Sequence, residues 1–77
     1  MNTQTRTIDG TTYHFVCLEG RNGYDVIEVM AKGKGSLSYP KFRYERYKLY
    51  PWQLLGKSSG ESSRILDILG EIWDAAL

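Results

Sequence analysis

The chain has 77 residues, of which 42% are hydrophobic and 25% charged, and its formal net charge is +1. This length fits a single domain, residues 1–77, and the composition is that of a globular chain and not of a disordered one. A net charge so close to zero argues against a protein that binds polyanions with its whole surface. Any electrostatic attraction must come from a local patch.

Cysteine usage and hydropathy indicate where the protein works. Cys17 is the only cysteine, which excludes an internal disulfide framework and favours a reducing compartment. The first residues are polar and lack the apolar core of a signal peptide. No apolar run approaches the roughly 20 residues that a membrane span requires. We therefore expect a cytoplasmic protein with no membrane association.

The first part of the sequence predicts β-strands joined by tight turns. Residues 3–8 and 11–18 are rich in β-branched and aromatic residues. Asp9-Gly10 between them predicts a hairpin, because glycine tolerates the positive φ of a type I′ turn. Asn22-Gly23 marks a second turn, and alternation over residues 24–31 predicts the next strand. Residues 32–36, with glycine at alternate positions, predict a mobile basic loop.

Aromatic and charged residues are interleaved over residues 39–52. Tyrosines favour a strand over residues 41–50, with Pro40 at its start or on an edge, and a helix that starts at Pro40 is the alternative. A strand would carry on one side Phe42, Tyr44, Arg46, Lys48 and Tyr50. Residues 51–55 predict one helical turn that ends at Gly56.

The last segment predicts one amphipathic helix. Ser58 and Glu61 have the spacing of a capping box, in which each side chain binds a backbone N–H of the first turn. Apolar residues then recur at helical spacing and form one broad stripe: Ile65, Leu66, Ile68, Leu69, Ile72, Trp73, Ala76 and Leu77. The whole pattern predicts an α+β fold, an antiparallel meander of three to four strands with this C-terminal helix packed across one face.

The interleaved stretch is the candidate working surface. Tyrosine and arginine are enriched in protein interfaces, and nucleic-acid binders pair aromatic platforms with cations. The default interpretation is a purely structural role, in which the large amphipathic side chains of the stretch close a small core. The candidate partner-binding residues are Tyr39, Lys41, Arg43, Tyr44, Arg46, Tyr47, Lys48, Tyr50 and Trp52, with loop contacts from Lys32 and Lys34.

No catalytic or metal-binding pattern is found. His14 and Cys17 are three residues apart, so on a strand they point to opposite faces and cannot act together. A metal site would need more ligands than this pair supplies. The carboxylates of Asp67, Glu71 and Asp74 form a ridge that is typical of the solvated side of a helix. We expect no enzyme activity, no cofactor and no metal site.

These observations favour a small non-enzymatic binding module that recognises a protein partner through the aromatic-basic surface and modulates or inhibits it. The alternative is a nucleic-acid-binding domain that uses residues 39–52 and the basic Lys-Gly loop at residues 32–36. Pairing of an exposed edge strand would give a homodimer. In size and style, without a shared motif, the chain is similar to small accessory and inhibitor proteins, including those encoded by phages and mobile elements.

Overall fold

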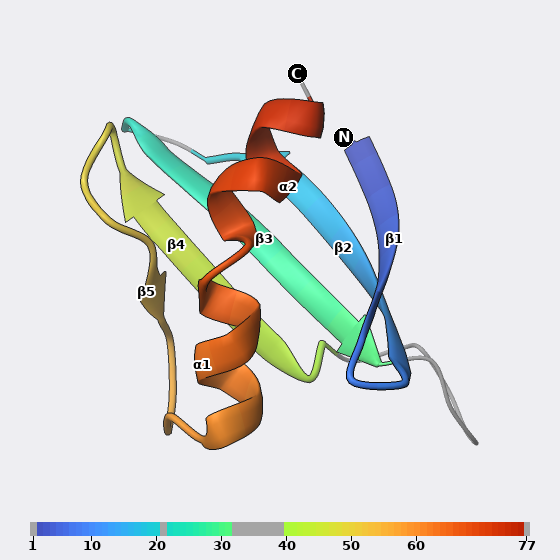
Figure 1. The fold of residues 1–77 in the computed structure, drawn as a ribbon. Coiled ribbons are helices and arrows are strands. Elements are labelled where there is room, and N and C mark those ends of the chain that lie inside the picture. The colour runs from blue at the N-terminus through green and yellow to red at the C-terminus, as the bar shows by residue number, and fades with distance from the viewer. Residues whose placement is uncertain (1, 21, 32–39, 77) are drawn as a thin grey trace.

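A computed structural model describes residues 2–20, 22–31 and 40–76 of the chain (Figure 1). The strands in these residues are β1 Asn2–Ile8, β2 Thr11–Glu19, β3 Tyr24–Ala31, β4 Phe42–Tyr47 and β5 Gln53–Leu54, and the helices are α1 Gly60–Leu66 and α2 Leu69–Ala76. The strands form one antiparallel sheet in the order β1-β2-β3-β4-β5, and both helices lie on the same face of it. The α+β class and the antiparallel meander are confirmed.

The two predicted turns are present. Asp9 and Gly10 have φ angles of 50° and 79°, as a two-residue turn between β1 and β2 requires. Asn22 and Gly23, in the connection from β2 to β3, have φ angles of 59° and 84°. The predicted Lys-Gly loop at residues 32–36 lies outside the described residues.

The interleaved stretch forms a strand, but the strand is shorter than predicted and is followed by another. β4 ends at Tyr47 because Lys48 takes a φ of 51° and the backbone N–H of Tyr50 then donates to the carbonyl oxygen of Tyr47 at 3.0 Å. Lys48 and Tyr50 therefore do not continue the face of β4. The helical turn predicted for residues 51–55 is wrong, because β5 pairs there with β4 through Tyr44–Leu54 and Glu45–Gln53.

The single C-terminal helix is also corrected, since two helices are present. The backbone N–H of Ile68 donates to the carbonyl oxygen of Ile65 at 3.1 Å, a tight turn that ends α1 before α2 begins. The break allows α1 to lie beside β5 while α2 crosses over β1 and β2 (Figure 1).

The predicted capping box is displaced by one residue. Ser59, not Ser58, caps α1: its hydroxyl accepts from the N–H of Ser62 at 3.1 Å, and the Ser62 hydroxyl accepts from the N–H of Ser59 at 2.7 Å. Glu61 has no part in this cap, because its carboxylate accepts hydrogen bonds from the hydroxyl of Tyr13 and from the ammonium of Lys41.

The core lies between the sheet and the two helices. Its buried members are Tyr13, Phe15, Cys17, Ile27, Val29, Tyr44, Ile65, Leu69, Ile72 and Trp73. Side-chain amides of β1 also bind α2, since Asn2 donates to the carbonyl oxygen of Ala76, and Gln4 to that of Ile72 at 2.8 Å. Within residues 2–20, 22–31 and 40–76, no helix has both the length and the apolarity needed to cross a membrane.

Candidate functional site

Strand alternation divides the interleaved stretch into a buried half and an exposed half. Tyr44 lies at 0% exposure in the core, so its neighbours Arg43 and Glu45 point to the side of the sheet that the helices leave open. Tyr47 lies on that open side as well, two residues beyond Glu45. Of the other candidates, Tyr39, Lys32 and Lys34 lie outside the described residues.

Tyr44 belongs to the buried half and fastens α1 to the sheet. Its hydroxyl donates to the carbonyl oxygen of Ser62 at 2.8 Å. Burial, with a smaller contribution from the charge of Glu61, raises the pKa of Tyr44 to about 12. Tyr44 is thus part of the fold and has no surface to offer to a partner.

Arg46 and Trp52 also lie on the helix side. The guanidinium of Arg46 lies 4.6 Å from the ring centroid of Trp52 and 5.7 Å from that of Trp73, and it pairs with the Asp25 carboxylate at 3.2 Å. Only 16% of the Arg46 side chain is exposed. This cation therefore lies against two neighbouring indoles, with its charge balanced inside the domain.

Lys41 is engaged with α1. Its ammonium lies 3.1 Å from the Glu61 carboxylate, which also accepts the hydroxyl proton of Tyr13. The hydrogen bond from Tyr13 and the charge of Lys41 lower the pKa of Glu61, against the opposing effect of partial burial. The same burial and hydrogen bond raise the pKa of Tyr13. This cluster connects β2 and the start of β4 to the first turn of α1.

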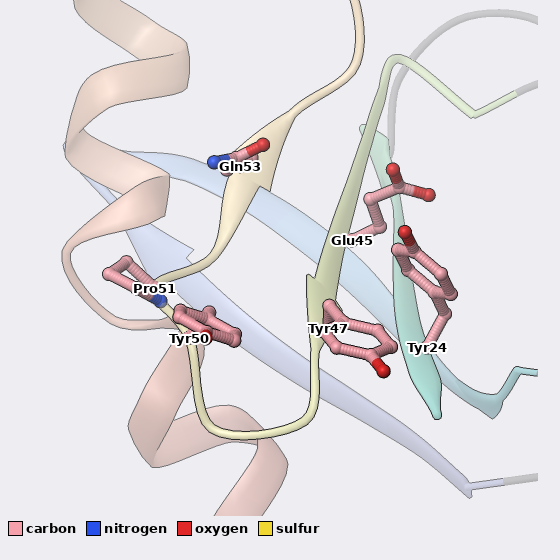
Figure 2. Close-up of a pocket in the computed structure, with 6 residues that line it drawn as sticks. All are labelled: Tyr24, Glu45, Tyr47, Tyr50, Pro51 and Gln53. Carbon is pink, nitrogen blue, oxygen red and sulfur yellow. The ribbon is translucent and has the colours of Figure 1, made fainter. Parts of the chain in front are cut away.

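The exposed half centres on three tyrosines from separate segments. Tyr24 at the start of β3 pairs in register with Tyr47 at the end of β4, and Tyr50 lies in the β4–β5 connection. The ring centroids of Tyr24 and Tyr47 are 4.9 Å apart at 52°, and those of Tyr47 and Tyr50 are 6.0 Å apart at 19°. Figure 2 shows Tyr47 between the other two rings. Tyr50 is the most open, at 64% exposure.

These rings form one wall of a recess of about 210 Å³, which we call the tyrosine recess. It is lined by Tyr24, Glu45, Tyr47, Tyr50, Pro51 and Gln53 (Figure 2). Glu45 and Gln53 are register partners on β4 and β5, and they supply its polar wall. Among the described residues, no cation lies within ion-pair distance of the Glu45 carboxylate.

The connection beside the recess presents an apolar tip, which we call the loop tip and define as Lys48, Leu49 and Tyr50. Leu49 is 93% exposed, and the three residues line a shallow surface. The Lys48 ammonium lies 5.3 Å from the centroid of the Tyr47 ring. Gly23 permits this packing, since at its φ of 84° any Cβ would be strained and would approach Tyr47 to 3.3 Å.

Sequence reasoning missed four of the residues that line this site, including Pro51 and Gln53. Tyr24 and Glu45 did not belong to the candidate set, although both line the recess. The position of Tyr24 depends on the register between β3 and β4, in which Tyr24 pairs with Tyr47. A connection as long as that between these strands does not fix the register, so no signal in the sequence could have joined the two tyrosines.

His14 and Cys17 lie on opposite faces of β2, as predicted. Cys17 is a free, buried thiol whose pKa is raised by burial, and Nδ1 of His14 lies 3.2 Å from the hydroxyl of Thr5 on the open face. Among the described residues, no three His, Cys, Asp or Glu side chains gather as metal ligands.

Comparison of the chain with protein-family models, with curated protein sequences and with solved structures found no match. Function must therefore be inferred from the residues themselves.

Proposed function

We propose that the domain is a non-enzymatic binding module that recognises a protein partner through the tyrosine recess and the loop tip, and so modulates or inhibits it. One observation carries the proposal, the concentration of large exposed apolar side chains at one end of the sheet. They are Tyr24, Tyr47, Leu49 and Tyr50. Aromatic side chains in such a setting supply large, rigid contact area at low entropic cost, which is why tyrosine is enriched in binding hot spots.

The charge distribution favours a protein over a nucleic acid. A nucleic-acid site would need cations that follow the phosphates beside the stacked bases. Two of the candidate cations have partners inside the domain, Arg46 with Asp25 and Lys41 with Glu61. The recess itself is lined by the Glu45 carboxylate, which would repel a phosphate.

The proposal includes no catalytic step and places the module in the cytoplasm. The buried Cys17 has a raised pKa, which disfavours the reactive thiolate. A single free cysteine also fits a reducing compartment. A small accessory or inhibitor protein, including one encoded by a phage or mobile element, would have these features.

Truncation of the loop tip tests the proposal. Leu49→Ala combined with Tyr50→Ala should reduce the capture of partner proteins from source-cell lysate at least about tenfold, since hot-spot truncations each cost about 2 kcal/mol or more. The control is Leu55→Ala combined with Leu66→Ala, which removes two exposed leucines outside the recess and should leave capture unchanged. Quantitative mass spectrometry of the captured proteins gives the readout.

Two results would contradict the proposal. Undiminished capture by the loop-tip variant would place the interface elsewhere on the molecule. Binding of short oligonucleotides at low salt, with a steep loss of affinity as salt rises, would favour the nucleic-acid alternative.

A further inference from the structure

The walls of the tyrosine recess have the chemistry that attracts an organic cation. The face of a tyrosine ring carries negative electrostatic potential, so ammonium and guanidinium groups bind over it. Tyr24, Tyr47 and Tyr50 contribute three such rings to one recess, and Glu45 adds a full negative charge on the neighbouring wall. Figure 2 shows the Glu45 carboxylate on the same side of β4 as Tyr24 and Tyr47.

On the opposite face of β4, aromatic rings and a carboxylate surround a cation of the protein itself. There the Arg46 guanidinium lies 4.6 Å from the Trp52 centroid and 5.7 Å from that of Trp73, with Asp25 as its carboxylate at 3.2 Å. Glu45, the residue before Arg46, points to the other side of β4, where its carboxylate and three tyrosine rings line the recess. Within the described part of the chain, no cation pairs with this carboxylate.

Lys48 shows that a ring of this cluster attracts a cation. Its ammonium lies 5.3 Å from the Tyr47 centroid, so one ring of the cluster already attracts an intramolecular cation. Binding of a second cation at the same cluster would be weakened by repulsion from the Lys48 charge.

The size of the recess limits what can enter. Its volume of about 210 Å³ lies below the roughly 300–1,000 Å³ of pockets that enclose a whole small molecule. It has room for the head of one long side chain. The exposed Leu49 and Tyr50 beside it would contact the rest of the partner surface.

We infer that the tyrosine recess receives the basic side chain of an arginine or lysine from the protein partner, with Glu45 as its counter-charge. This inference rests on the proposed function and adds the chemistry of the partner. The partner therefore has a basic contact surface, and Glu45 and the three tyrosines are the residues that select it.

NMR titration with Nα-acetyl-arginine amide tests the inference directly. The ring resonances of Tyr24, Tyr47 and Tyr50 should shift together, with a dissociation constant on the order of millimolar for so small a probe. The matched neutral probe is Nα-acetyl-citrulline amide, which has nearly the same shape and no charge. It should bind at least about fivefold more weakly, since the cation–π and ionic contributions are lost.

Variants at the recess distinguish charge from shape. Glu45→Gln should weaken binding of the arginine probe about fivefold, whereas Lys48→Gln should strengthen it about twofold because a repelling charge is removed. Glu28→Gln is the matched control, because Glu28 lies on the same open face but does not line the recess. Tyr50→Phe should bind as the wild type does, and Tyr50→Leu should not.

The failure of the inference can be separated from the failure of the proposed function. Equal binding of the arginine and citrulline probes, or no effect of Glu45→Gln, would overturn the inference that a basic side chain enters the recess. The proposed function would still hold if capture depends on the loop tip. Tighter binding of phosphocholine than of the arginine probe would point to a lipid headgroup and would also overturn the inference. Capture insensitive to the loop tip would remove the proposed function itself, whatever the probes do.

Discussion

Trp73 connects α2 to Arg46 of β4 and to Trp52, the residue before β5. Only 7% of it is exposed, its ring centroid lies 5.6 Å from that of Trp52, and its face lies against the Arg46 guanidinium. Removal of the ring would leave a cavity and would also take one aromatic wall from a half-buried cation.

We therefore expect Trp73→Ala to lower the free energy of unfolding by about 3–5 kcal/mol, enough to unfold a domain of this size or leave it marginal. Trp73→Phe keeps an aromatic ring in place and should cost less. Urea unfolding followed by circular dichroism measures both values. A melting temperature equal to that of the wild type in Trp73→Ala would mean that α2 does not cover the core.

The roles of single residues in β4 could be predicted only in part from the sequence. Alternation predicted that its charged and aromatic residues divide between two sides, and they do. Alternation alone does not say which side the helices cover, so Tyr44 and Arg46 counted equally with Tyr47 as candidates. The structure places the first two against α1 and α2, and leaves Tyr47 at the recess.

At the level of elements, local sequence was ambiguous where two solutions differ by one residue. Ser58-Ser59 offers two adjacent caps, and the presence of Glu61 favoured Ser58 because acidic residues suit the third helical position. The structure uses Ser59 with Ser62, since Glu61 binds Tyr13 and Lys41 instead. Such a long-range contact has no signature in the helix sequence itself.

The two serines give a matched pair of variants. Ser59→Ala removes the hydroxyl that accepts from the Ser62 N–H and should destabilise the domain by about 1 kcal/mol. Ser58→Ala, one residue earlier and exposed, should change the free energy of unfolding by less than about 0.5 kcal/mol. Chemical denaturation distinguishes them. A larger loss of stability in Ser58→Ala than in Ser59→Ala would mean that Ser58 caps α1, as the sequence predicted.

β5 and the break between the helices could not be predicted for a related reason. The apolar residues from Ile65 to Trp73 keep one helical spacing across the break, so the periodicity continues where the helix does not. β5 has only two residues, and its strand character comes from pairing with β4, including the bond from the Leu55 N–H to the Arg43 carbonyl oxygen at 2.8 Å. At β5, tertiary pairing therefore overrides local preference.

At the level of the whole molecule, α1 is joined to the sheet by a small number of polar contacts. The Glu61 carboxylate accepts a hydrogen bond from the Tyr13 hydroxyl and pairs with the Lys41 ammonium. Arg64 pairs with Asp9 in the β1–β2 turn at 2.8 Å. Charged groups at these positions link the stability of the fold to pH.

Acid should therefore destabilise the domain through Glu61. Its folded-state pKa lies below the ordinary value of 4.5, mainly because of the hydrogen bond from Tyr13. The ionised form is favoured in the folded state, so the stabilisation is present above pH 4.5 and is lost as the pH falls through the lower folded value. Glu61→Gln should be less stable at neutral pH and should lose less stability on acidification.

Urea unfolding at several pH values between about 6 and 2 measures this slope, which linkage equates to a difference in bound protons. Glu71→Gln is the control, because Glu71 is exposed on α2 and belongs to none of these contacts. A pH slope that Glu61→Gln leaves unchanged would assign the acid sensitivity to other carboxylates.

The order of the strands has a consequence for how the chain reaches its fold. Every strand pairs with its neighbour in sequence, so the sheet can grow hairpin by hairpin, and the connection between β3 and β4 is the longest loop to close. The face that carries Phe15, Ile27 and Val29, however, is covered only when residues 60–76 dock. During synthesis the sheet would therefore emerge with its apolar side exposed. The nascent chain would be prone to aggregation until α1 and α2 dock on that side.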